Sequence, residues 1–185
     1  MAQTTSNVTA AKPATGGSLN VAATTASLPT STSASISSFT GLGYISEDGL
    51  TNEITRDSEE IKAWGGDTVL QPQTGFTDTF HCTLIEMLNT DVMKEVFGAA
   101  NVSGTLSAGI TVNVSSDELV ERAWVADMIM RGGVAKRIVI PKGRITEVGE
   151  ITYADSEAAG YEITITAFPD SSGKTHYEYV KEPAS

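Results

Sequence analysis

The sequence is poor in the residue types that build several common kinds of site. A single cysteine, Cys82, excludes an internal disulfide and a cysteine-based zinc site. Only 12 Lys and Arg oppose 23 Asp and Glu, a net charge of −11, which argues against a protein that grips nucleic acid by its phosphates. The longest apolar run is far too short to span a membrane. No charged-then-apolar leader opens the chain, so we expect an acidic, soluble protein without a secretory signal or membrane insertion.

Acidic residues are also absent from the first quarter of the chain. Residues 1–46 contain no Asp or Glu and one base, Lys12, and residues 1–40 include 17 serines and threonines. Such a segment buries too little apolar surface to offset its ordering entropy alone. We therefore divide the chain into an extended Ser/Thr-rich N-terminal arm, residues 1–40, and a β-rich domain, residues 41–185. The arm is either a disordered leader or a segment that orders against another subunit.

From about residue 42 the pattern is typical of β-strands. A short strand is predicted over 42–47, followed by an Asp-Gly turn. Residues 51–64 are charged and alternate poorly, although they carry isoleucines and a tryptophan. Residues 68–75 contain Pro72 and Gly75, which predict a loop or a sheet edge.

Two elements have clear periodicity. A strand is predicted over 76–86, because its apolar residues alternate with polar ones. A short helix is predicted after Asn89, an N-cap candidate, with Val92 and Val96 on one apolar stripe and Gly98 at the C-cap. The helix is expected to close one end of a β core.

The remaining chain predicts further strands and few other elements. Residues 119–131 are assigned as a strand rather than a helix, because β-branched and aromatic residues precede a Gly-Gly hairpin signal. The next strand, 134–140, is expected to end at Pro141 and Gly143. Both tryptophans, Trp64 and Trp124, fit core positions. The other predicted strands cover residues 110–114, 145–153, 161–168 and 176–180. The fold class is mainly β, a sandwich or barrel with one short flanking helix.

Residue types that carry chemistry are not arranged as a catalytic or metal site. His81 and Cys82 are neighbours in a predicted strand, so their side chains point to opposite faces and cannot easily share a metal. The sequence Gly173-Lys174-Thr175 lacks the upstream glycine of a phosphate-binding loop. Adjacent acids such as Glu59 and Glu60 diverge rather than converge as general acid–base catalysis requires. We therefore predict no enzyme, no cofactor, no metal and no catalytic residue.

Several short motifs follow one another between residues 40 and 170. They are GYISEDG at 43–49, IKAWGGD at 61–67, KRIVIPKG at 136–143, TEVGEITY at 146–153, GYE at 160–162 and TAFPD at 166–170. In this order and spacing they resemble the major tail protein, or tail tube protein, of siphovirus bacteriophages. The resemblance implies a structural virion protein whose hexameric rings stack into a hollow tail tube that conducts double-stranded DNA into the host cell.

The resemblance also implies partners and surfaces. The partners are other copies of the chain, the tape measure protein, the tail terminator and tail-tip proteins, with transient, non-specific passage of double-stranded DNA. The protein would be made in the bacterial host cytoplasm and end in the virion. The acidic residues expected to face the lumen are Glu47, Asp48, Glu53, Asp57, Glu59 and Glu60. The residues expected to form an inter-ring loop are Asp67, Thr68, Val69, Leu70, Gln71, Pro72, Gln73, Thr74 and Gly75. The residues expected to anchor the arm on another subunit are Leu28, Ile36 and Phe39.

Two other functions remain open from the sequence. One is the tube protein of a contractile secretion system, which also forms hexameric rings. The other is a capsid-decoration or carbohydrate-binding β module, for which we would expect a stable monomer or trimer with an exposed aromatic cluster.

Overall fold

The computed structural model describes residues 4–14, 19–156 and 158–183. As predicted, the described chain is mainly β, with one α-helix, α1 (Thr90–Phe97). Three short 3-10 turns cover Thr5–Asn7, Ala99–Asn101 and Arg131–Gly133. The strands are β1 (Ala11–Pro13), β2 (Leu19–Ala23), β3 (Thr40–Gly41), β4 (Thr51–Ser58), β5 (Ile61–Lys62), β6 (Thr68–Leu70), β7 (Gln73–Leu84), β8 (Val102–Thr105), β9 (Gly109–Val112), β10 (Arg122–Met130), β11 (Ala135–Val148), β12 (Tyr161–Ala167) and β13 (Tyr177–Lys181).

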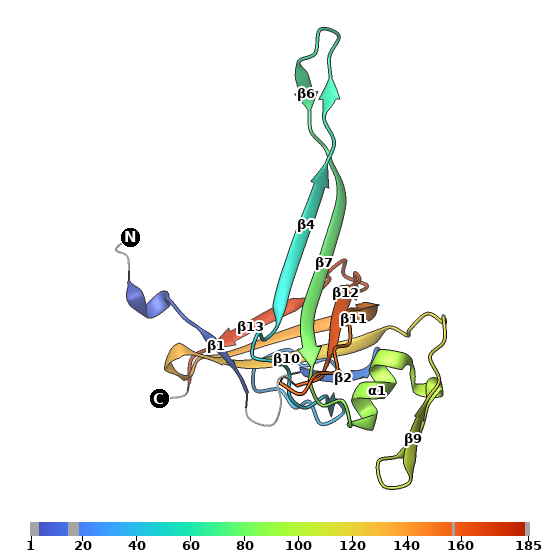
Figure 1. Cartoon of the computed structure of the whole chain (residues 1–185). Coiled ribbons are helices and arrows are strands. Elements are labelled where there is room, and N and C mark those ends of the chain that lie inside the picture. The colour runs from blue at the N-terminus through green and yellow to red at the C-terminus, as the bar shows by residue number, and fades with distance from the viewer. Residues whose placement is uncertain (1–3, 15–18, 157, 184–185) are drawn as a thin grey trace.

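One large antiparallel sheet forms the body, in the order β3-β2-β10-β11-β12-β7-β4. The long strand β11 belongs to two layers, because its first half pairs with β10 and β13 and its second half pairs with β12. In Figure 1 the β4–β7 pair runs across the direction of β10, β11 and β13. Among the described residues no pairing joins β3 to β4, so the sheet is open and does not close into the predicted barrel.

The core lies between the two layers. Phe80, Ile163 and Ile165 from the β7–β12 layer are fully buried with Trp124 from β10. The Trp124 Nε1 donates a hydrogen bond of 3.0 Å to the Gly143 carbonyl, so the one polar atom of this large ring is satisfied inside the core.

The helix forms where its capping signals predict it. Asn89 caps the N-terminus, since its side chain accepts a hydrogen bond from the Asp91 backbone amide at 3.0 Å. Val92 and Val96, one helical turn apart, are buried in the core. Gly98, with φ of 91°, ends the helix in a conformation that suits glycine.

The N-terminal segment is more integrated than its composition predicts. Within the segment expected to form the arm, β2 pairs with β10 and places Leu19 and Val21 in the core, and the boundary at residue 40 stays a prediction. Residues 24–39, which we call the covering segment, lie against the other face of the layer formed by β2, β10 and the first half of β11, where Arg137 binds the carbonyls of Ser31 and Ala34. Parts of the predicted arm, residues 1–3 and 15–18, lie outside the described residues.

A buried arginine fixes the covering segment to the sheet. Arg137, 5% exposed, donates from Nη1 to the carbonyls of Ser31 at 2.9 Å and Ala34 at 2.7 Å. Its other two nitrogens bind both carboxylate oxygens of Asp127, at 2.6 and 2.9 Å. The guanidinium therefore has partners on two strands and on the segment above them, as a buried charge requires.

Three strand predictions need correction. Residues 42–47 are not a continuous strand; Gly43 has φ of 74° and only Ile45 forms an isolated bridge. The strand predicted to stop at Pro141 instead continues to Val148. It therefore includes the start of the strand predicted over 145–153, and residues 149–153 form no strand. Pro141 is accommodated beside a register irregularity in the β10–β11 ladder, where the interrupted pairing needs no amide donor.

Candidate assembly surfaces

The most exposed feature is a long hairpin, β4 to β7, that projects away from the body of the molecule (Figure 1). We call residues 51–76 the hairpin arm. Every residue from 51 to 71 is exposed. The arm narrows to the short β5–β6 pair and turns at its tip, where the Gly66 amide donates to the Ala63 carbonyl at 3.0 Å. Because neither face of the outer arm, residues 59–71, is covered by the described residues of its own chain, its side chains are available to a partner.

The predicted inter-ring loop, Asp67–Gly75, is the returning side of this arm rather than a loop. It contains β6 and the first residues of β7. Pro72 lies between these two strands, and its carbonyl accepts a hydrogen bond of 3.1 Å from the Glu59 amide across the arm. The proline therefore interrupts no strand ladder, which is why this sequence is compatible with a hairpin.

Large apolar side chains line the arm without cover. Ile61 and Leu70 are opposite each other on β5 and β6, at 47% and 57% exposure. Trp64, predicted to be in the core, is instead fully exposed at the tip, because the turn places no other strand over it. A row of exposed apolar groups on a projecting element indicates an interaction surface.

The layer formed by β4, β7, β12 and the second half of β11 has one buried and one polar face. Its buried face carries Phe80, Cys82, Leu84, Ile163 and Ile165. Strand pairing places the alternate residues on the other side, which we call the threonine face. It comprises Thr51, Glu53, Thr55, Asp57, Thr77, Thr79, His81, Thr83, Glu162, Thr164, Thr166, Arg144, Thr146 and Glu147.

Hydrogen bonds between side chains run across the threonine face. His81 lies between two threonines, with Nε2 3.1 Å from Thr79 Oγ1 and Nδ1 3.0 Å from Thr164 Oγ1. The hydroxyls of Thr146 and Thr166 are 2.8 Å apart. These hydrogen bonds link neighbouring strands, and the result is a hydroxyl-rich surface.

The threonine face is also acidic. Glu53, Asp57, Glu147 and Glu162 lie on it, whereas its one arginine, Arg144, already pairs with Glu118. A surface with this balance repels polyanions at short range.

The same layer has a free strand edge on each side. β4 pairs only with β7, and residues 144–148 of β11 pair only with β12, among the described residues. The three pairings are antiparallel, so β4 and β11 run in opposite directions. Unpaired edges are templates for another strand, and here a second copy could continue the antiparallel order from either edge.

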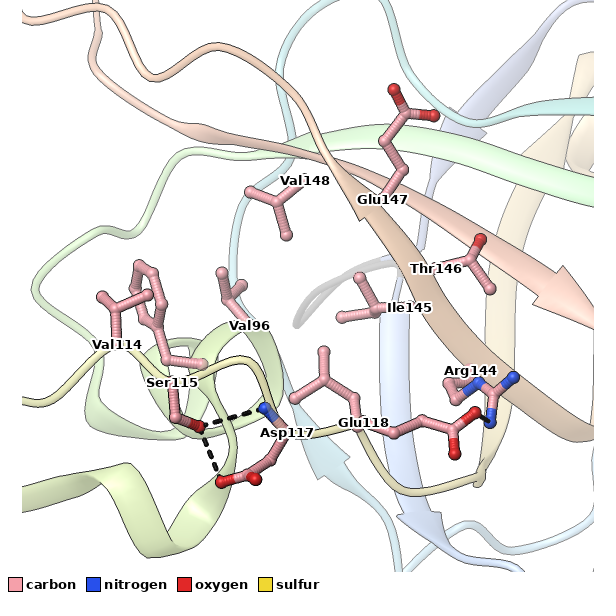
Figure 2. Close-up of a pocket in the computed structure, with 12 residues that line it drawn as sticks. Val96, Val114, Ser115, Asp117, Glu118, Arg144, Ile145, Thr146, Glu147 and Val148 are labelled. Atoms are coloured by element: carbon pink, nitrogen blue, oxygen red, sulfur yellow. Dashed lines mark hydrogen bonds and ion pairs between the residues drawn. The ribbon is translucent and has the colours of Figure 1, made fainter.

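A groove of about 400 Å³ lies beside the free edge of β11 (Figure 2). Val96 from α1 and Ile145 and Val148 from β11 line it, with Val114 on the facing segment. That segment is held by the Glu118–Arg144 ion pair. The groove is an apolar recess at the rim of the core, open next to an unpaired strand.

Three acidic side chains surround this groove. Asp117 Oδ2 accepts a hydrogen bond of 2.8 Å from Ser115 Oγ, and Glu118 is paired with Arg144. Glu147 has no partner among the described residues. The groove thus combines apolar walls with excess negative charge at its mouth.

A buried carboxylate ties the base of the arm to the end of the chain. Asp78, on β7, accepts hydrogen bonds from Asn52 Nδ2 at 2.8 Å and Thr175 Oγ1 at 2.6 Å. His176 Nδ1 lies 2.6 Å from the same carboxylate, and its ring packs edge-on against Phe80. No buried side-chain polar atom of the described residues lacks a hydrogen-bond partner, so we interpret this cluster as a structural contact that the sequence pattern did not indicate.

The structure separates the six acids predicted to face a lumen. Glu53 and Asp57 lie on the threonine face together with Glu147 and Glu162, which sequence reasoning missed. Glu47 and Asp48 lie in the turn after Ile45, beside β1 and β10. Glu59 and Glu60 lie on the outer arm, where Glu60 pairs with Lys62 at 3.8 Å. Alternation with buried residues would have found Glu162, whereas Glu147 follows a β-bulge after Ile145, so simple alternation would place it on the buried side.

The three predicted arm anchors lie in or beside the covering segment of the same chain. Leu28, Ile36 and Phe39 are half-buried there. Their predicted contact with another subunit stays a prediction, and it concerns only the portion of each side chain that remains exposed.

Comparison with known proteins gives one family. The family model described as phage tail tube protein matches residues 1–184. None of the curated proteins matches the chain. No helix within the described ranges is long enough and apolar enough to cross a membrane.

Proposed function

Because the chain belongs to the phage tail tube protein family, we propose that its copies form hexameric rings and that the rings stack into the hollow tail tube of a siphovirus-type phage. A tail tube protein is a structural component of the virion rather than an enzyme. In this proposal the tube conducts double-stranded DNA into the host cell. The subunit is made in the host cytoplasm before it joins the virion.

The observation that carries the proposal is the pair of free edges on the four-stranded layer. β4 of one copy lies antiparallel along residues 144–148 of β11 in the next copy, which continues the alternation already present in each subunit. An even number of strands per copy lets the order repeat around a closed ring. Ring closure leaves no free edge, which removes the aggregation hazard that an isolated subunit presents.

The resulting ring has the dimensions of a DNA conduit. Four strands from each copy of a hexamer give about 24 strands at ~4.8 Å spacing, a circumference of ~115 Å and a diameter of ~37 Å before strand tilt widens it. A duplex passes through an opening of this size.

The threonine face suits the lumen wall. Its acids repel the phosphates of DNA, and several of its hydroxyls are already hydrogen-bonded to His81 or to one another, so we expect DNA to slide without binding. Salt screens this repulsion over about 8 Å at physiological ionic strength, so it acts mainly on DNA that approaches the wall. Of the six predicted lumen residues, Glu53 and Asp57 are retained in the proposal, with Glu147 and Glu162 added.

The hairpin arm suits a contact with the next ring. Its outer part, residues 59–71, projects beyond the four-stranded layer, and the exposed apolar side chains there are not covered by the described residues of their own chain (Figure 1). The tape measure protein would occupy the lumen before DNA passes, while the tail terminator and the tail-tip proteins would cap the two ends of the stack.

Electron microscopy of the concentrated protein, with and without tail tips as seeds, tests the proposal. Hollow tubes with sixfold rings are expected. A matched variant replaces residues 60–71 with Asn-Gly, joining Glu59 to Pro72, whose backbones are already adjacent. That variant is expected to remain folded and to form rings that do not stack. Small particles that stay unpolymerised with seeds would refute the tube function, and normal tubes from the trimmed variant would refute the role of the arm.

A further inference from the structure

The core side of the β4–β7 layer continues outward beyond the body that covers it. Ile54 lies opposite Asp78, and Arg56 lies opposite Phe76. Asp78 is buried, but Ile54 is 49% and Phe76 41% exposed. Arg56 stacks on the Phe76 ring, with its guanidinium carbon 4.7 Å from the ring centre. These three side chains, the base patch, are therefore an uncovered extension of a core surface.

The groove beside β11 is also an incompletely covered part of the core. Its apolar walls, including Val96 and Val148, belong to the rim of the core but have an opening where the β11 edge is unpaired. In Figure 2 the side chains of Val96, Ile145 and Val148 point toward this space. No described residue of this chain fills the opening of the groove, and the apolar side chains of the base patch are only partly covered by the described residues.

The strand register, including the bulge between Ile145 and Glu147, places these two surfaces on the same side of the layer. Ile145 and Val148 lie on the core side of β11, as Ile54 lies on the core side of β4. When a second copy adds its β4 antiparallel along residues 144–148, Ile54 and Arg56 point toward the groove. Glu53 and Thr55 then extend the threonine face. A slip of one residue would reverse both faces, so the pairing has one acceptable parity.

The charges are complementary as well. The groove mouth has Asp117 and Glu147 in excess, since Glu118 is already paired with Arg144. Arg56 has no carboxylate partner among the described residues of its own chain; its only polar contact is with Gln73 Oε1 at 3.3 Å. Asp117 retains acceptor capacity beyond its bonds with Ser115, which suits a guanidinium donor.

We propose that the base patch of one subunit seats in the β11 groove of a neighbouring copy, with Ile54 and Phe76 covering the apolar walls and Arg56 pairing with Asp117. The inference rests on the proposed ring. It adds a specific side-chain lock to the backbone pairing of the edges, and it assigns the groove to a second copy of this chain rather than to a small molecule.

Disulfide trapping tests the lock. The double variant Ile54→Cys, Val148→Cys is assembled and oxidised, with Thr55→Cys, Val148→Cys as the matched control on the opposite face. Two strands separate β4 from the paired part of β11 within a chain, so a bond inside one subunit is too long to form. The native Cys82 is buried and does not compete. The first variant is expected to give a ladder of linked chains that stops at the hexamer, and the control is expected to stay monomeric.

Charge reversal provides a second measurement that does not depend on cysteine variants. Arg56→Glu is expected to raise the critical concentration for tube formation by about tenfold or more, and adding Asp117→Arg is expected to restore it. The lock would be overturned if the wild type forms tubes but the first cysteine variant gives no cross-link. Equal cross-linking of the first variant and the control would also overturn it. Either result would leave the tube function intact. Normal assembly of Arg56→Glu would also overturn it. Failure of the wild type to form rings or tubes when seeded would overturn both proposals.

Discussion

Removing the Arg137 side chain tests how the covering segment is held. The guanidinium is almost fully buried and binds Asp127 and two carbonyls of the covering segment. In Arg137→Ala the Asp127 carboxylate, with a side chain 17% exposed, loses its counter-charge, and the carbonyls of Ser31 and Ala34 lose their donor. Breaking a buried pair from one side costs about 3–5 kcal/mol, so we expect the free energy of unfolding to fall by that amount.

A neighbouring ion pair supplies the control. Lys136 precedes Arg137 on β11 and binds Glu178 at 2.8 Å, but these side chains are 22% and 42% exposed. Exposed pairs contribute about 0–1 kcal/mol, so Lys136→Ala is expected to cost no more than that. The two variants remove a charge from adjacent positions of one strand and differ mainly in burial.

Urea denaturation measures the free energies of unfolding. Proteinase K digestion measures how accessible the covering segment is to cleavage. Arg137→Ala is expected to become sensitive to cleavage within residues 24–39 under conditions where the wild type and Lys136→Ala are resistant. Equal unfolding free energies for the two variants, or equal protection of the segment, would refute the reasoning that the buried guanidinium holds it.

Two further predictions concern the core. Gly143→Ala is expected to destabilise the fold by about 1–3 kcal/mol in the same urea assay, because a Cβ there would lie 2.8 Å from Trp124 Cδ1 and 2.9 Å from Ile165 Cγ2. If the variant is as stable as the wild type, the neighbouring core side chains can move to accept the Cβ, and the reasoning is refuted. Burial raises the pKa of the Cys82 thiol to about 12, so iodoacetamide at pH 8 is expected to leave it unmodified in the native protein and to alkylate it fully in urea; rapid native modification would contradict its placement.

Local patterns predicted the elements whose stability is largely local. The helix followed from the Asn89 cap, the Val92–Val96 spacing and Gly98. Which face of β7 is buried followed from the alternation of Phe80, Cys82 and Leu84 with polar residues. The β10–β11 hairpin followed from Gly132 and Gly133. In each case neighbours in the sequence determine the geometry.

The N-terminal strand was missed because its partner is distant in the sequence. Leu19–Ala23 is a short apolar run inside a Ser/Thr-rich segment, and its average composition resembles a flexible arm. Pairing with β10 and the bonds from Arg137 supply the stabilisation that the segment lacks alone. No local property of residues 1–40 indicates that an arginine 106 positions after Ser31 and 103 after Ala34 will bind their carbonyls.

The candidate surfaces were only partly predictable for a similar reason. Trp64 carries the same hydrophobic signal as Trp124, yet one is exposed at a hairpin tip and the other is in the core. Hydrophobicity predicts that a residue will be covered, but not whether its own chain covers it. Glu147 and Glu162 join Glu53 only through the register of three strand pairs, which spacing along one strand does not contain.

The pairing of β2 with β10 also determines when the subunit can be completed on the ribosome. β2 ends at Ala23 and its partner begins at Arg122, so most of the chain must be translated before the N-terminal strand can dock. The β4–β7 pair, by contrast, is available much earlier, because its two strands are close in sequence. The nascent chain therefore carries its projecting element before its body is closed. An acid-free, hydroxyl-rich leader is well suited to this delay, since it stays hydrated without a partner while the remaining strands emerge.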